Sequence, residues 1–257
     1  MPIRETLKAP KGFLYPVRGL RLIVSDWRVF RFAILPFLVN TLLFAAFFLG
    51  FNYFAYEISS WVFQESSQQW YWYVLSTIMG VALFVVSIFV VMFGFVAVGL
   101  VVAAPFNDML AAAVEKKLTG EVKEVDMSLW RLVVFTVKNE TRKMAVILLA
   151  QGALLLINLV PGFGQMIFIV LSPLFLALVM AYEFTGYTLD RRGFSFSQKR
   201  RYITGRLGIS LGFGFAVVLT LAIPIINFLT LPLAVAGGVL FVTENPPEQT
   251  PPKERAP

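Results

Sequence analysis

The segment "VVAAPFNDML", Val101–Leu110, ends a long apolar run. No charged side chain occurs between Glu65 and Asp108. As one helix, residues 70–106 would be about 55 Å long at 1.5 Å per residue, whereas the hydrocarbon core of a bilayer is about 30 Å thick. We therefore expect a membrane helix that extends beyond the bilayer.

The end of this run predicts a change of helix. Pro105 cannot continue a helix interior without loss of a hydrogen bond, and Asn107 or Asp108 can cap a helix that follows. Gly120 is a plausible stop for that second helix. The segment is therefore expected to join a membrane helix to a charged surface helix.

The composition indicates an integral membrane protein. Hydrophobic residues make up 58% of the 257 residues and charged residues only 14%, and the mean hydropathy is +0.76. Soluble domains carry about 25% charged residues. We expect the lipid bilayer to be the main partner. The net charge of +7 is interpreted as loops that face anionic lipid, and no nucleic-acid partner is expected.

Several chemistries are excluded by missing residue types. The chain has no cysteine and no histidine, which removes thiolate nucleophiles, Cys/His zinc sites and histidine acid–base catalysis. No nucleotide-binding or hydrolase motif is evident. We expect no enzyme activity, no catalytic residue, no metal site and no cofactor.

Three further apolar runs complete the predicted fold. The first, Phe32–Tyr56, is long enough to cross a membrane once. The other two are Met144–Tyr182, interrupted at Val160–Gln165, and Leu207–Thr243, interrupted at Ile223–Pro232. Each begins with an arm of 17 residues, so these hairpins either cross the bilayer or dip into it and return. They either mark a transport site or are purely structural.

The predicted fold class is an all-α integral membrane protein. It has two long transmembrane helices, two short Pro/Gly-broken helical hairpins and charged cytoplasmic helices. Residues 1–243 are expected to form one helical membrane domain, followed by a disordered polar tail at 244–257. Because the basic segments can all share one side, both termini are predicted to be cytoplasmic.

Several segments resemble one membrane-protein family. They are "AAPFNDMLAAAVEKKLTG" (Ala103–Gly120), "FRFAILPFLVN" (Phe30–Asn40), "LVPGFGQ" (Leu159–Gln165) and "IPIINFLTLPLAVAGG" (Ile223–Gly238). Together they resemble the CysZ sulfate transporters and the related etoposide-induced-protein-like membrane proteins. The resemblance covers roughly residues 12–243. It implies an oligomeric importer of sulfate in the bacterial inner membrane that supplies cysteine biosynthesis.

The candidate anion site lies before the first membrane helix. Sulfate requires arginine forks or the N–H groups of a helix start. Arg21, Arg28 and Arg31 fit this need, and Arg28 and Arg31 share a helix face. Alternatively, each arginine anchors the chain at the membrane edge.

The resemblance adds detail to this site. Gly19 and Arg21 match the family, and Arg31 matches the second arginine of its sulfate-binding pattern. Phe30 replaces the first arginine, and Arg28 takes the glycine position. Either Arg28 restores the second charge or the site is lost. Gly186, before Tyr187, replaces an acidic residue and also indicates a divergent member.

Two functions follow from these features. The first is a permease or channel for sulfate or a related oxyanion, in the form of a homo-oligomer. The four apolar runs contain no carboxylate, which favours a channel-like or uniporter mechanism over proton coupling. The alternative is a non-transporting membrane scaffold or a lipid- or partner-binding protein.

Overall fold

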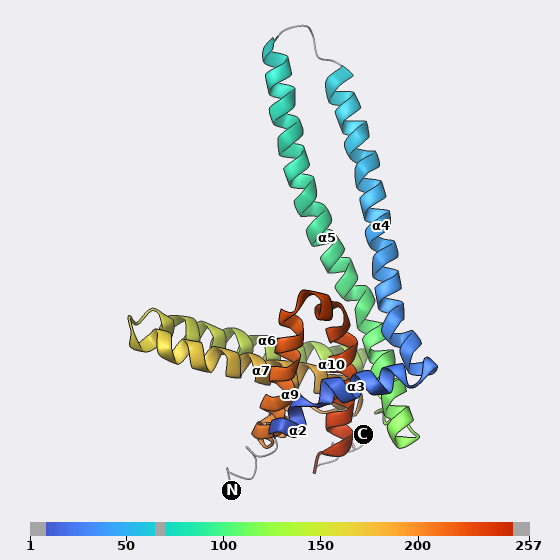
Figure 1. Ribbon diagram of the computed structural model, residues 1–257, viewed down its shortest axis with the longest axis vertical. Coiled ribbons are helices and arrows are strands. Elements are labelled where there is room, and N and C mark those ends of the chain that lie inside the picture. The colour runs from blue at the N-terminus through green and yellow to red at the C-terminus, as the bar shows by residue number, and fades with distance from the viewer. Residues whose placement is uncertain (1–8, 65–69, 249–257) are drawn as a thin grey trace. The chain divides into compact units, whose positions relative to one another are not determined.

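The computed structural model describes residues 9–64 and 70–248, and every regular element among them is a helix. Figure 1 labels these helices. In chain order they are α2 (Ala9–Phe13), α3 (Tyr15–Val24), α4 (Trp27–Gln64), α5 (Trp70–Thr119), α6 (Leu129–Asn158), α7 (Phe163–Arg191), α8 (Phe196–Thr204), α9 (Leu207–Ala222) and α10 (Pro224–Glu244). The predicted all-α class is confirmed.

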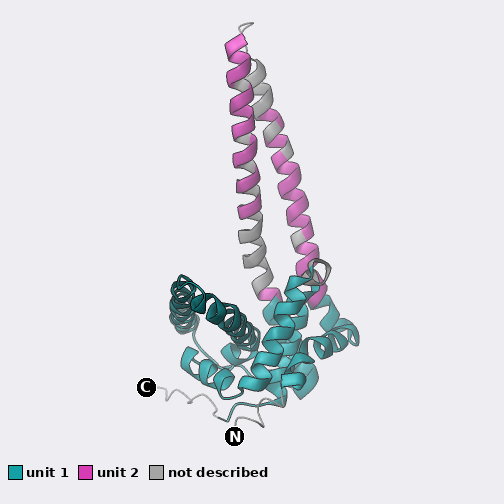
Figure 2. Ribbon diagram, turned by 60° about the vertical axis from the view of Figure 1, so that its left-hand side comes forward, with its two compact units in different colours: residues 1–32, 107–257 teal, residues 33–106 magenta. Residues whose placement is uncertain are grey.

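The chain divides into two units, coloured separately in Figure 2. Unit 1 comprises residues 1–32 and 107–257, and unit 2 comprises residues 33–106. The expectation of one membrane domain over residues 1–243 stays a prediction. Of the predicted tail, residues 245–248 follow α10, and residues 249–257 lie outside the described residues.

Two described helices are long and apolar enough to cross a membrane. They are Trp27–Phe51 within α4 and Phe163–Arg191, which is α7. The chain bends by 99° between helices α8 and α9. If the two helices count as one broken span, this pair is a third candidate membrane span. The presence of two long apolar helices is therefore confirmed by length and composition, but the second of them is α7, which was predicted as part of a hairpin, and not the helix predicted over residues 70–106.

The predicted break at Pro105 was wrong. Helix α5 continues through Pro105 to Thr119, so neither Asn107 nor Asp108 caps a new helix. A proline removes one intrahelical bond, here to the carbonyl of Val101, and a long helix absorbs that loss when neighbouring turns adjust. The stop at Gly120 is confirmed, since this residue has φ +82° and its N–H donates to the Lys116 carbonyl at 2.9 Å.

The two apolar hairpins of unit 1 differ from the expected pattern. Helices α6 and α7 lie side by side (Figure 1) and are joined by residues 159–162, with Gly162 at φ +78°. Helix α6 starts as early as Leu129, so its arm is longer than 17 residues. Helix α10 runs through Pro232, so the second interruption is confined to Ile223. Their depth in the bilayer stays a prediction.

The core of unit 1 lies between α3, α7, α9 and α10. Tyr15 stacks on Phe241 at 5.5 Å, and Phe213 meets the same ring edge-on at 5.8 Å. Glycines bring the backbones together: a Cβ on Gly214 would lie 1.8 Å from the Ala177 carbonyl oxygen. The N-terminal helices are thereby held on the C-terminal hairpin.

Candidate functional site

The corner between α3 and α4 carries the candidate anion site. Helix α3 ends at Val24, and Asp26 starts α4. The Asp26 carbonyl accepts the N–H groups of Val29 and Phe30, and its Oδ1 accepts the Arg28 N–H at 2.9 Å. Asp26 is thus an N-cap. The bond from the Arg28 N–H, aided by Lys117, lowers the pKa of the Asp26 carboxyl.

A lysine at the end of α5 fixes this corner. Lys117 Nζ donates to Ser25 Oγ at 2.9 Å and to the Leu22 carbonyl at 3.4 Å. It also lies 3.4 Å from Asp26 Oδ2. The corner therefore has a defined position on the C-terminal end of α5.

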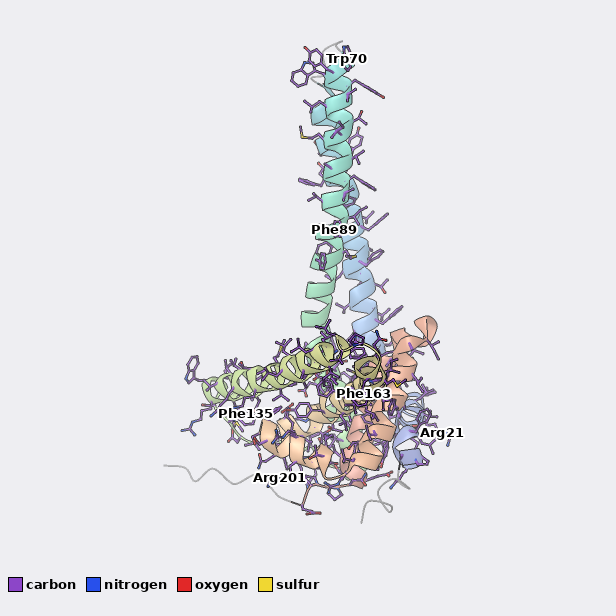
Figure 3. All side chains as sticks on the ribbon, turned by 90° about the vertical axis from the view of Figure 1, so that its left-hand side faces the viewer. Arg21, Trp70, Phe89, Phe135, Phe163 and Arg201 are labelled. Carbon is purple, nitrogen blue, oxygen red and sulfur yellow. The ribbon has the colours of Figure 1, made fainter. Side chains whose placement is uncertain are left out.

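The three predicted arginines are exposed at this corner. Arg21 lies in the last turn of α3 (labelled in Figure 3), and Arg28 and Arg31 lie near the start of α4. The Arg31 guanidinium lies over the Phe32 ring at 4.8 Å. Within the described part of the chain, none of the three side chains forms an ion pair or a hydrogen bond. Each guanidinium is available to an anion.

Gly19 has a different place. It is buried, and a Cβ there would lie 2.9 Å from both the Gly237 nitrogen and the Leu233 carbonyl oxygen of α10. Its visible role is to let α3, the helix of Arg21, pack closely on α10. A direct part in anion binding stays a prediction.

Several cations of unit 1 are paired, in contrast to the three arginines. Glu244, at the end of α10, binds Arg18 and lies 3.2 Å from Lys11, and the Tyr15 hydroxyl donates to it at 3.1 Å. The bond from Arg18 lowers the pKa of Glu244 to about 2, and burial raises the pKa of Tyr15 to about 12. The disordered tail was predicted to start at residue 244, whereas Glu244 is the last residue of α10. This network was therefore not predicted from the sequence.

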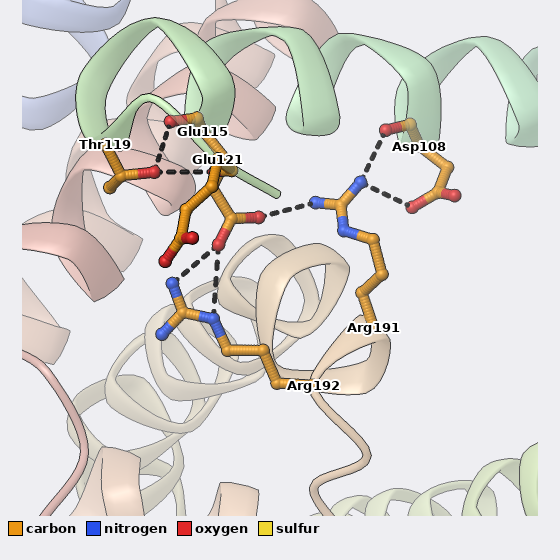
Figure 4. A network of polar contacts seen from close by, with 6 residues as sticks. All are labelled: Asp108, Glu115, Thr119, Glu121, Arg191 and Arg192. Carbon is orange, nitrogen blue, oxygen red and sulfur yellow. Dashed lines mark hydrogen bonds and ion pairs between the residues drawn. The ribbon is translucent and has the colours of Figure 1, made fainter. Parts of the chain in front are cut away.

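A second ion-pair network joins α5 to α7 (Figure 4). Glu115 is fully buried and lies 2.6 Å from Arg192 and 3.4 Å from Arg191. Arg191 also lies 3.4 Å from Asp108 and donates to its carbonyl at 3.0 Å. The sequence predicts Asp108 as a helix cap, whereas its ion-pair partner is 83 residues away. No sequence pattern marks such distant pairs.

The arrangement offers anion binding without covalent chemistry. Among the described residues, no group of three or more carboxylates lies close enough to hold a metal ion. The unpaired groups at the corner are all guanidinium donors, and the start of α4 adds the positive end of a helix dipole.

Comparison with known proteins places the chain. A sequence model of the family described as "Sulfate transporter CysZ/Etoposide-induced protein 2.4" matches residues 15–232. The chain is similar to "Sulfate transporter CysZ" of Vibrio parahaemolyticus, with 32% identity over 91% of this chain and 94% of that protein. The protein of the same name from Vibrio cholerae (strain O395) is 31% identical over 95% of this chain and 98% of its own length. The protein of the same name from Pectobacterium atrosepticum is 30% identical over 86% of this chain and 82% of its own length. With matches over most of its length, this chain belongs to the sulfate transporter CysZ/etoposide-induced protein 2.4 family.

Proposed function

We propose that this chain is a multi-pass protein of a bacterial inner membrane that lets sulfate, or a related small oxyanion, pass across the bilayer. The observation that carries the proposal is the set of three exposed, unpaired arginines, with Arg21 shortly before the apolar span Trp27–Phe51 and Arg28 and Arg31 in its first turns. The name "Sulfate transporter CysZ", borne by its relatives, supports the same substrate.

The chemistry of the corner suits a tetrahedral dianion. A guanidinium presents paired N–H donors that match two oxygens of one anion. Arg28 and Arg31 are three residues apart on α4 and so share a face. Their exposure keeps binding weak enough for release, which conduction requires.

The proposed mechanism is channel-like or uniporter passage down a gradient. A proton-coupled carrier would place a carboxylate within the membrane, and the apolar runs of this sequence contain none. We further propose that both termini are cytoplasmic, that the protein works as a homo-oligomer, and that the imported sulfate supplies cysteine biosynthesis.

The alternative is a non-transporting scaffold or a lipid- or partner-binding protein of the same family. Phe30, in the place of an arginine, favours this alternative. The Phe30 ring stacks on Trp27 at 5.4 Å and offers no donor to an anion. In that case the three arginines would only reach the lipid headgroups at the membrane edge.

Uptake of radiolabelled sulfate by liposomes that hold the purified protein tests the proposal. The variant Arg28→Ala/Arg31→Ala is compared with Lys138→Ala/Arg142→Ala, which removes two exposed charges from α6. Each lost charge-assisted bond is worth about 1.5–3 kcal/mol, so we expect the first variant to take up sulfate at least about tenfold more slowly. The control should match the unchanged protein.

Two outcomes would count against the transporter. One is the absence of uptake above empty liposomes with folded, inserted protein, which favours the scaffold. The other is equal loss in both variants, which would mean that bulk surface charge, and not the corner, sets the rate. Competition by excess sulfate but not by chloride would support a selective site.

A further inference from the structure

A cavity of about 460 Å³ lies in unit 1, away from the three arginines in sequence. It is formed by α8, by the junction between α8 and α9, and by the residues that follow α10. Its volume is in the range of small-molecule sites, about 300–1,000 Å³. A bare sulfate ion would fill only a small part of this volume.

The polar groups that line the cavity are mainly donors. Arg201 is exposed, and within the described part of the chain its guanidinium has no hydrogen bond or ion pair. Arg206 donates from Nη2 to the Pro246 carbonyl at 3.1 Å, which leaves its other N–H groups available. The Gln198 Oε1 accepts two bonds from Ser195 at 2.8 Å, so its amide N–H groups remain for a ligand.

The cavity wall is preorganised. Tyr202 is buried, donates to the Asn245 carbonyl at 2.7 Å, and lies under the Arg206 guanidinium at 4.5 Å. Asn245 in turn donates from Nδ2 to the Tyr15 hydroxyl at 3.0 Å. The position of Arg206 is therefore set by contacts that exist before any ligand arrives, which lowers the cost of binding.

The charge balance favours an anion with a strong negative charge. Two arginines line the cavity, and Glu248 is the lining acid. Helix α9 begins at Leu207, next to lining residue Arg206, and no side chain caps it, so its dipole adds positive potential. A phosphomonoester carries a charge of about −1.5 to −2 at neutral pH and offers three acceptor oxygens.

We propose that this cavity binds a phosphomonoester that carries a small hydroxylated body. The phosphate would bind Arg201, Arg206 and the Gln198 amide, and the Glu248 carboxylate would accept a hydroxyl of the body. Such a group is found on soluble phosphorylated metabolites and on the headgroup of lysophosphatidic acid, whose glycerol keeps one free hydroxyl. The site is separate from the arginine corner and does not depend on the proposed transport.

Calorimetry on the full-length protein in phosphatidylcholine nanodiscs tests the site with two probes. Glycerol 3-phosphate represents the soluble source, and monohexanoyl lysophosphatidic acid carries the same phosphate and one free hydroxyl on a glycerol with one short acyl chain. Arg201→Gln and Arg206→Gln are compared with Arg200→Gln. Arg200 is exposed on the same helix but does not line the cavity.

We expect Kd for at least one probe to rise about tenfold or more in Arg201→Gln and Arg206→Gln, since each loses a charge-assisted bond. Arg200→Gln should change Kd less than about twofold. Tighter binding of glycerol 3-phosphate identifies a soluble ligand, and tighter binding of the lipid identifies a headgroup site. An unchanged Tm without ligand shows that the variants are folded.

Three results would overturn the proposal. The first is the absence of binding by either probe. The second is an equal loss in Arg200→Gln and Arg201→Gln, which means attraction by surface charge alone. The third is binding of inorganic phosphate or sulfate as tight as that of the esters, because the organic body would then not be recognised.

Discussion

Phe213 in unit 1 and Phe93 in unit 2 are the same side chain in opposite surroundings. Phe213 is 0% exposed, whereas Phe93 is 63% exposed. Unit 1 covers its aromatic core with its own helices. Unit 2 displays apolar side chains along α4 and α5, among them Phe48, Trp70 and Phe89. Hydropathy alone therefore does not say whether a helix is covered by the protein or by lipid.

The contrast also runs inside unit 1. Leu159, in the turn between α6 and α7, and Phe163, at the start of α7, are more than 70% exposed. Farther along α7, Ala177 and Ala181 are fully buried. One helix thus passes from a surface suited to lipid to a packed core.

The largest expected effect comes from a substitution of Gly214, which lies between two packed helices of unit 1. In Gly214→Ala, the new Cβ would lie 1.8 Å from the Ala177 carbonyl oxygen, so α7 and α9 must separate. We expect loss of folded protein, measured as the monodisperse yield after detergent extraction. In α5, Gly80→Ala meets no atom within 4 Å, and a change of at most about 1 kcal/mol is expected, since alanine favours helices. Similar yields for the two variants would contradict the close contact.

The two phenylalanines give the next largest effect. Phe213→Ala should lower the free energy of unfolding by about 3–5 kcal/mol, because it leaves a cavity beside Tyr15 and Phe241. Phe93→Ala should change it by less than about 0.5 kcal/mol, since its ring has no core to leave empty. Denaturant unfolding in mild detergent measures both. Equal losses would mean that unit 2 is covered by protein.

The buried carboxylate of Glu115 allows a further comparison between a buried and an exposed side chain. Glu115→Gln leaves Arg191 and Arg192 without their shared carboxylate in a buried place. Removing one partner of a buried ion pair costs about 3–5 kcal/mol, and we expect the lower end because glutamine still accepts one bond. The matched control is Glu121→Gln, whose exposed carboxylate pairs with Lys123 at 3.6 Å. An equal effect of the two substitutions would exclude a structural role for Glu115.

The smallest effect depends on pH. The folded pKa of Glu244 is about 2, below its ordinary 4.5. Its contribution is therefore complete above pH 4.5 and is lost as pH falls towards 2. Because the carboxylate is partly exposed, we expect only about 1 kcal/mol. Glu244→Gln should lower Tm at pH 7 and lose that difference near pH 2; a difference independent of pH would contradict the assignment.

Much of this protein follows from local sequence properties. The helical class, the apolar runs and the helix end at Gly120 depend on composition, periodicity and a single positive φ. The segment with Arg21, Arg28 and Arg31 could be found because charges beside an apolar span are visible in a linear sequence. Whether these residues bind an anion stays a prediction.

Only the tertiary structure decided the rest. Pro105 lies within a continuous helix, although its ring removes one intrahelical hydrogen bond. The partners of Glu115 lie 76 and 77 residues away, and those of Glu244 include residues 226 and 229 positions away. The walls of the cavity come from residues before and at the start of α9 and from residues after α10. Such contacts depend on how helices pack, and packing depends on pairs of surfaces that no single stretch of sequence contains.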